Sequence, residues 1–182
     1  MEIKPPSTAT LADWSAQVET RTGLKLNVRS VSPDDEQAVI DFFKQIAPED
    51  LRFRFLSSMN AVGSALAHEL VDVDHIETEN LLAFDSEDGS LVASAMVAAD
   101  DKTSDAEVAV AVRSDCKGQG VGWAMLNHAC DFARVRGFER VHSIELSDNR
   151  SVISLEKEMG FEARPCPDDM TLTILSKALN PA

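Results

Sequence analysis

Residues 110–123 read VAVRSDCKGQGVGW, and this stretch decides the fold. An apolar strand pattern leads into a short polar turn, and glycines at positions 118, 120 and 122 open a segment with helical periodicity. Glycine leaves room where a backbone must pass close to another group. The N-terminus of a helix offers unpaired N–H groups and a partial positive charge, which together bind phosphate. The stretch therefore predicts a phosphate-binding turn between a strand and a helix.

Two nucleotide-binding motifs are excluded at this turn. A P-loop needs GxxxxGK followed by Ser or Thr, which the turn lacks. A dinucleotide fingerprint needs Gly or Ala at its third position, which is Trp123 when counted from the first glycine and Met125 from the second. A tight turn whose glycines serve packing alone is the remaining alternative. It leaves the nearby basic pair, Arg113 and Lys117, unexplained.

The composition predicts one globular domain in a chain of 182 residues, with 44% hydrophobic and 26% charged residues. No apolar run approaches the roughly 20 residues that span a bilayer, and the start lacks a basic stretch before an apolar core. We therefore expect a cytoplasmic protein with neither a membrane segment nor a secretory signal. Three widely spaced cysteines and four histidines without ligand spacing predict no metal site.

The formal net charge is −14, so the surface repels phosphate backbones and argues against nucleic-acid binding. Such a surface suits a cationic partner such as an amine, although simple solubility explains it equally well. A cluster of four acids admits the same two interpretations, a rim that attracts a cationic amine or a solvated loop. Its members are Asp72, Asp74, Glu77 and Glu79.

Hydrophobic periodicity divides the chain into an N-terminal arm, residues 1–22, and one domain, residues 23–180. The arm carries a predicted short helix around Leu11 to Val18. Strands are predicted at Leu24–Val31, Asn80–Phe84, Leu91–Ala98, Ala106–Val112 and Arg140–Leu146, with two more within 161–178. Helices are predicted after Ser32, after Ala47, at about Ala61–Val71, from Gly122 to Arg136 and at Asn149–Met159. This order predicts an α/β class, with helices on the faces of a mixed sheet.

Two motifs resemble those of the GNAT family of N-acetyltransferases. The run KGQGVG, residues 117–122, resembles the family motif (Arg/Gln)-x-x-Gly-x-(Gly/Ala), with lysine at the first position. The segment NRSVISLEKEMGF, residues 149–161, is similar to the family's next motif, an asparagine-led helix that closes on Gly-Phe. The resemblance covers residues 24–178. It implies a single-domain α/β (α+β) GNAT fold, with a mostly antiparallel mixed sheet of about six to seven strands and about four to five helices.

The resemblance implies acetyl-CoA as co-substrate and no metal. The pyrophosphate would bind the backbone N–H groups of the glycine turn, and the pantetheine arm would pair with the end of the preceding strand, where one N–H would polarise the thioester carbonyl. The implied cofactor-binding residues are Val110, Ala111, Val112, Lys117, Gly118, Gln119, Gly120, Val121, Gly122 and, beside the pantetheine, Asn149.

Glu107 is the predicted general base. An amine is mostly protonated at neutral pH and must lose a proton before it attacks. Glu107 lies at the start of the apolar strand that leads to the glycine turn, where partial burial would raise its pKa. The alternative is a strand-end glutamate that faces solvent. A matching glutamate serves as base in the lysine acetyltransferases that residues 107–118 resemble.

The predicted activity is acetyl transfer to a primary amine, with protein lysine favoured because of this resemblance. A small amine or amino acid as acceptor, and a non-catalytic acyl-CoA-binding sensor, are the alternatives; the presence of Glu107 favours an enzyme. The chain has no tyrosine, and Glu156 stands where many family members place a tyrosine that protonates the leaving thiolate. Solvent or another group would then protonate it, or no acid is needed. Monomer and homodimer both remain open.

Overall fold

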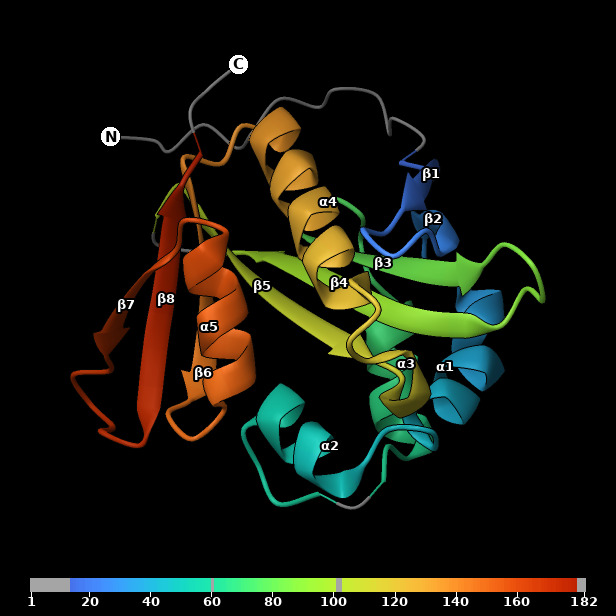
Figure 1. Ribbon diagram of the computed structural model, residues 1–182, viewed down its shortest axis with the longest axis horizontal. Coiled ribbons are helices and arrows are strands. Elements are labelled where there is room, and N and C mark those ends of the chain that lie inside the picture. The colour runs from blue at the N-terminus through green and yellow to red at the C-terminus, as the bar shows by residue number, and fades with distance from the viewer. Residues whose placement is uncertain (1–13, 60, 101–102, 180–182) are drawn as a thin grey trace.

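The computed structural model describes residues 14–59, 61–100 and 103–179 (Figure 1). These residues form one eight-stranded sheet with the order β1-β2-β3-β4-β5-β6-β8-β7. The strands are β1 Ala16–Glu19, β2 Lys25–Ser30, β3 Thr78–Asp85, β4 Leu91–Ala99, β5 Asp105–Val112, β6 Arg140–Leu146, β7 Glu162–Pro165 and β8 Leu172–Ala178. All neighbouring strands are antiparallel except β5 and β6, which are parallel. The predicted fold, a mixed and mostly antiparallel sheet with helices, is confirmed.

Five α-helices and two 3-10 turns join the strands. They are η1 Pro33–Asp35, α1 Glu36–Phe43, α2 Pro48–Phe55, α3 Ser64–Val71, η2 Ser114–Cys116, α4 Val121–Arg136 and α5 Arg150–Glu158. The predicted ends of two helices are confirmed. Gly137 and Gly160 follow α4 and α5 with φ of 89° and 88°, a backbone conformation that favours glycine.

The predicted helix around Leu11 to Val18 is wrong where the structure describes it. Ala16–Glu19 is a strand that pairs antiparallel with β2, with Val18 opposite Leu26. Residues 11–13 lie outside the described part of the chain. The exposed edge of β2 supplies hydrogen-bond partners for this segment, and such tertiary pairing overrides a weak local helical preference. This strand brings the count to eight, above the six to seven expected.

Two apolar cores cover the two faces of the sheet. On one face, α4 packs across β4 and β5, and Met125, Ala129 and Phe132 belong to its core (Figure 1). On the other face, α1, α2 and α3 surround a second core that includes Phe42, Phe43 and Leu82. Successive residues of β5 point to opposite faces, so Ala106 and Val108 belong to the first core and Ala111 to the second.

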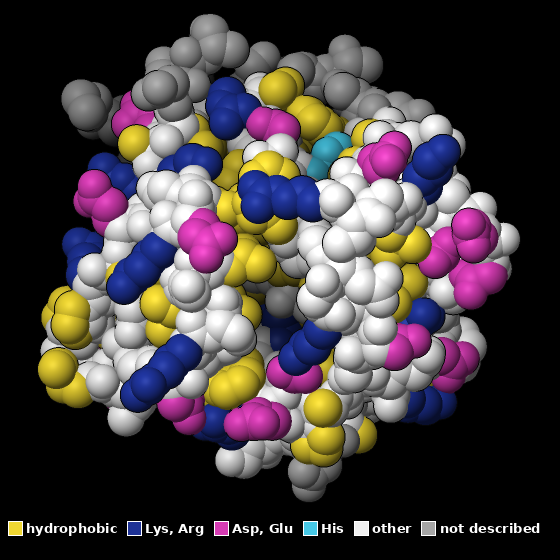
Figure 2. Space-filling model, viewed as in Figure 1, with side chains coloured by type: hydrophobic (Ala, Val, Ile, Leu, Met, Phe, Trp, Pro, Cys, Tyr) yellow, Lys and Arg dark blue, Asp and Glu magenta, His cyan; other side chains and the backbone are white. Residues whose placement is uncertain are grey.

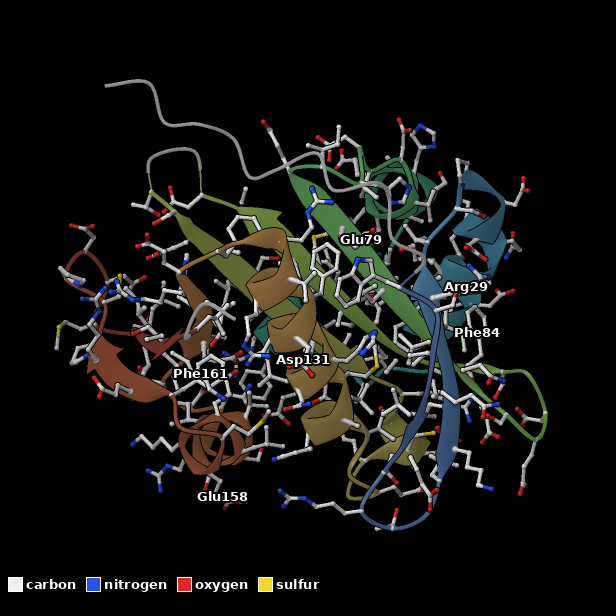
Figure 3. The ribbon with its side chains drawn as sticks, turned by 90° about the horizontal axis from the view of Figure 1, so that it is seen from above. Arg29, Glu79, Phe84, Asp131, Glu158 and Phe161 are labelled. Atoms are coloured by element: carbon white, nitrogen blue, oxygen red, sulfur yellow. The ribbon has the colours of Figure 1, made fainter. Side chains whose placement is uncertain are left out.

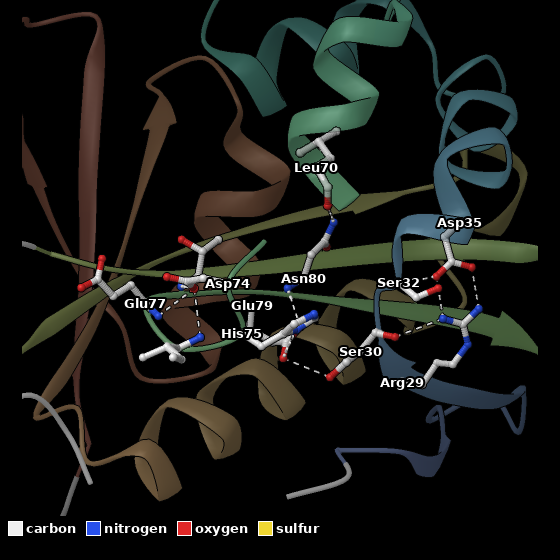
Figure 4. Close-up of polar contacts among 12 residues, drawn as sticks. Arg29, Ser30, Ser32, Asp35, Leu70, Asp74, His75, Glu77, Glu79 and Asn80 are labelled. Carbon is white, nitrogen blue, oxygen red and sulfur yellow. Dashed lines mark hydrogen bonds and ion pairs between the residues drawn. The ribbon is translucent and has the colours of Figure 1, made fainter. Parts of the chain in front are cut away.

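Asn80 links the sheet to α3. Its side chain is buried, donates a 2.8 Å hydrogen bond to the Leu70 carbonyl (Figure 4) and accepts a 2.7 Å bond from the Ser94 hydroxyl. Nearby, the Asp35 carboxylate accepts two 2.7 Å bonds from Arg29 and one of 2.8 Å from the Ser32 N–H, which fixes the entry into α1. Buried polar groups of this kind stabilise only when their partners are present.

The Asn80 contacts predict a stability defect. Asn80→Leu leaves the Leu70 carbonyl and the Ser94 hydroxyl buried without partners, so we expect the free energy of unfolding to fall by about 2–4 kcal/mol. Ser94→Ala, the control, removes only one bond and is expected to lower it by about 1 kcal/mol. Urea unfolding followed by circular dichroism measures both, and equal stability of Asn80→Leu and the wild type would contradict this role.

Candidate functional site

A cavity opens where the two parallel strands separate. The pairing of β5 with β6 is limited to Asp105–Glu107 against Arg140–His142, although β5 continues to Val112 and β6 to Leu146. A cavity of about 370 Å³ lies in the resulting gap, between β5, β6, the glycine turn, α2 and α5. Figure 2 shows the surface hollowed between α5, α4 and α2. The separation therefore creates the space for a ligand.

The edge of β5 that faces this cavity carries backbone groups that pair with no other strand of the described chain. The Arg113 N–H donates to the Val92 carbonyl at 2.9 Å, and the register with β4 continues without a shift back to Ala106. Because backbone groups alternate in direction along an antiparallel strand, Ala111 is directed toward β4, whereas Val110 and Val112 are directed toward the gap. Of the three strand residues predicted to bind cofactor, Val110 and Val112 thus present N–H and C=O groups to the cavity.

The glycine turn closes one end of the cavity. Gly118 and Gly120 have φ of 74° and 78°, in the left-handed region that favours glycine. The first helical bond of α4 joins the Ala124 N–H to the Gly120 carbonyl at 3.0 Å, so the N–H groups of Val121 and Gly122 precede the helical ladder. Lys117, Gly118, Gly120, Val121 and Gly122 line the cavity. The glycine turn therefore places backbone N–H groups beside the cavity, at the N-terminus of a 16-residue helix.

The hairpin between β1 and β2 supports this turn from outside. The Thr22 hydroxyl donates a 2.8 Å bond to the Gln119 carbonyl, and Gln119 does not line the cavity. A Cβ on Gly120 would lie 3.4 Å from the Arg21 nitrogen and from the Thr20 Cβ. Sequence reasoning missed this support, because nothing in residues 14–22 indicates that they pack against a turn about a hundred positions later.

The two basic side chains near the turn are engaged within the protein. Lys117 Nζ lies 2.5 Å from an oxygen of Asp50 in α2. Arg113 pairs with Asp115 at 2.6 Å, donates to the Ser90 hydroxyl at 3.0 Å and does not line the cavity. Binding of an anion would therefore depend on backbone N–H groups more than on these charges.

Glu107, the predicted base, lines the cavity near the last paired residues of β5 and β6. Its side chain is 50% exposed, and its carboxylate lies 4.0 Å from His142 Nε2. Glu107 is thus more open to solvent than the sequence analysis expected, while it retains access to the cavity.

Two further glutamates line the opposite wall, and sequence reasoning missed Glu145 altogether. Glu145 accepts a 2.8 Å bond from the amide of Asn149, and burial, reinforced by the charge of Glu156, raises the pKa of Glu145 to about 7. Glu156 is buried and accepts a 2.5 Å bond from the Ser143 hydroxyl, and burial likewise raises its pKa to about 7. Asn149, the predicted pantetheine contact, is buried in the same wall and lines the cavity.

The acidic cluster of residues 72–79 does not form a rim of this cavity. Asp74 accepts bonds of 2.9 Å from three successive backbone N–H groups, those of residues 76–78. Glu79 bonds His75 at 3.1 Å and the Ser30 hydroxyl at 3.0 Å (Figure 4). Asp74 and Glu79 thus organise the start of β3. The cluster is neither a rim of the cavity nor simply a solvated loop, because Glu79 is buried.

The Acetyltransferase (GNAT) family model matches residues 36–161, which include the glycine turn and both walls of the cavity. The chain belongs to the GNAT acetyltransferase family. It is therefore an acyltransferase, and the family uses acyl-CoA as donor. An acetyltransferase of Pseudomonas aeruginosa is 30% identical over 159 residues, which cover 86% of each chain.

Solved GNAT structures share the fold. The GNAT domain of S. lividans PAT superposes with a TM-score of 0.83 at 25% identity, over 91% of this chain and 97% of that one. Spermidine N-acetyltransferase from Vibrio cholerae, solved with CoA and spermine, gives a TM-score of 0.72 at 12% identity, over 86% of this chain and 96% of that one. The second likeness, at this low identity, concerns the fold alone.

Neither a membrane span nor a metal cluster is found within the described ranges of this GNAT protein. No helix there is long and apolar enough to cross a bilayer. No group of three or more His, Cys, Asp or Glu side chains in those ranges is arranged to hold a metal ion.

The buried carboxyl of Glu156 predicts a pH-dependent loss of stability. Between its ordinary pKa of 4.5 and the folded value of about 7, the folded state keeps a proton that the unfolded state has released, so stability falls as pH rises through this window. Glu156→Gln keeps an acceptor for Ser143 and cannot ionise. The free energy of unfolding should therefore fall less in this variant than in the wild type as the pH rises from about 5 to about 8. We expect the difference to be on the order of 1–3 kcal/mol.

Urea unfolding at the two pH values measures this difference. Glu158→Gln is the matched control, because Glu158 is exposed on the outer side of the same helix (Figure 3). Its pH dependence should follow that of the wild type. Parallel curves for all three proteins would show that Glu156 does not titrate as described.

Proposed function

We propose that the cavity between β5 and β6 binds acetyl-CoA and that Glu107 accepts a proton from the primary amine that receives the acetyl group. One observation carries this proposal: the unpaired edge of β5 leads directly into the glycine turn at the N-terminus of α4. A linear ligand with amide groups at one end and a pyrophosphate at the other matches this succession of backbone donors and acceptors.

In this arrangement the pyrophosphate is held by the N–H groups of Lys117, Gly118, Gly120, Val121 and Gly122. The expectation for Gln119 changes, because it does not line the cavity. Val110 and Val112 pair with the pantetheine amides, and Asn149 contacts the same arm from the facing wall. One N–H of the β5 edge polarises the thioester carbonyl and stabilises the oxyanion that develops during attack. The expectation for Ala111 changes, because its backbone is directed toward Ser94 of β4.

Transfer is direct. Glu107 takes a proton from the ammonium, and the neutral nitrogen attacks the thioester carbon. The C–S bond then breaks, coenzyme A leaves as a thiolate, and the second proton of the attacking nitrogen passes to solvent, which leaves a neutral amide. Exposure of Glu107 lets the proton pass on to solvent. Cys116 lines the cavity, but burial raises the pKa of its thiol and keeps it protonated, which disfavours an acyl-cysteine intermediate.

Protein lysine is the favoured acceptor, because residues 107–118 resemble bacterial protein lysine acetyltransferases. A small amine is the alternative acceptor. A non-catalytic acyl-CoA sensor is less well supported, because a sensor needs no carboxylate in its cavity, whereas Glu107 lines this one.

Charge at the glycine turn tests the cofactor site. Gly118→Asp places a carboxylate at a position where a Cβ meets nothing within 4 Å, and Asp tolerates positive φ better than most residues. We expect at least about tenfold weaker CoA binding by calorimetry, since the new charge repels the pyrophosphate. Gly118→Asn is the control of equal shape and should retain most of the affinity. Equal affinities of the two variants would place the pyrophosphate elsewhere.

The base is tested by Glu107→Gln. Loss of the proton acceptor should lower kcat at least about tenfold at neutral pH, while calorimetric CoA affinity stays unchanged. Glu162→Gln, an exposed glutamate of β7, is the control and should keep full activity. The rates are those of acetylation of a lysine peptide and of small amines, measured by the release of the free thiol of CoA. Wild-type turnover in Glu107→Gln would remove Glu107 from the mechanism.

A further inference from the structure

The cavity is lined by a partly buried cation that the proposed acetyl transfer does not use. Arg54, near the end of α2, lines the cavity. Its Nε is inaccessible to solvent and has no hydrogen-bond partner in the described part of the chain. We propose that the Arg54 guanidinium forms a subsite for a carboxylate carried by a substrate. This inference rests on the proposed function, because it assumes that substrates enter this cavity.

The neighbours of the Arg54 guanidinium are a thioether sulfur and an aromatic ring. Its Nη2 lies 4.0 Å from the sulfur of Met96, and its guanidinium carbon lies 5.0 Å from the centre of the Phe55 ring. Glu107 and Glu145 lie close enough to act on its charge. Neither forms an ion pair with it within the described ranges, where all the salt bridges of α2 belong to Asp50 and Arg52. A thioether and a ring compensate a guanidinium whose Nε is inaccessible to solvent only in part.

A carboxylate is the group that would best complete the contacts of the Arg54 guanidinium. Arginine presents its N–H donors in a planar fork that matches two carboxylate oxygens, and such charge-assisted bonds are among the strongest in proteins. The neighbouring Arg52 illustrates the contrast, because it pairs with Asp148 at 2.9 Å outside the cavity. Arg54 lacks such an oxygen partner from the described residues and lines the cavity that the proposed substrates enter.

Two substrates could carry the carboxylate. It could lie at the end of the acyl group, as in a dicarboxylic acyl-CoA, or beside the amine, as in an amino acid. Both ends meet at Glu107, the proposed base, and Glu107 lies within electrostatic reach of Arg54. In the second case, Glu107 and Arg54 would bind the ammonium and the carboxylate of one molecule.

Matched substrate pairs distinguish the two sources. Succinyl-CoA and butyryl-CoA have acyl chains of equal length, with and without a carboxylate, and are compared with 1,5-diaminopentane as acceptor. L-Lysine and 1,5-diaminopentane differ by the carboxylate and are compared with acetyl-CoA as donor. We expect the wild type to favour the carboxylated member of one pair in kcat/KM. Arg54→Met should lower that preference about tenfold or more.

Controls separate this subsite from a structural role. Arg52→Met removes the neighbouring charge and should leave the preference unchanged. Arg54→Lys keeps the charge without the fork and should give an intermediate preference, which is informative even if Arg54→Met folds poorly. Calorimetry of CoA with wild type and Arg54→Met tests the cofactor site separately, and its failure in the wild type would overturn the proposed function instead.

Two results would overturn the subsite. One is a wild type that fails to prefer the carboxylated member in either pair. The other is an Arg54→Met variant whose kcat/KM falls equally for all substrates with a shifted pH profile, because Arg54 would then act only on the charges of Glu107 and Glu145. A lost preference with unchanged CoA binding confirms the proposal.

Discussion

The early end of the pairing between β5 and β6 is the constraint on which the site depends. Backbone groups of a central strand normally pair on both sides, and a buried edge without partners is costly. Here, three residues of β5 have partners on β6, and the remainder faces a cavity. The core under α4 holds β5 in place while its edge stays open. An extended ligand can therefore pair with the strand at little conformational cost to the protein.

Local signals made much of the fold predictable. The glycines at 118, 120 and 122, the helix ends at Gly137 and Gly160, and the apolar strand pattern before the glycine turn each reflect a short-range physical rule, and the structure follows them. The strand at Ala16–Glu19 was not predictable, because its stability comes from the edge of β2 and not from its own four residues.

The residues of the candidate site also divide into those with a local sequence signal and those without one. The glycine turn and Glu107 could be proposed from the sequence because they lie on one continuous stretch of chain. Arg54 and Glu145 could not, because the property that distinguishes them, a position in the wall of a cavity, arises only when α2 and β6 meet. The pattern LRFRF contains two arginines, and nothing in it indicates which of the two will line a cavity. Long-range packing therefore supplies the electrostatics that short motifs lack.

The attachment of α2 has a consequence for the entrance of the cavity. Asp50 ties this helix to the glycine turn, and Arg52 ties it to the loop before α5, through ion pairs of 2.5 Å and 2.9 Å. Both pairs are partly exposed, and dissolved salt screens such attractions over distances of roughly 10 Å at 0.1 M. The attachment of α2 to the two walls therefore depends on the solution as well as on the fold. Higher ionic strength weakens both ion pairs and so loosens the closure of the cavity on that side.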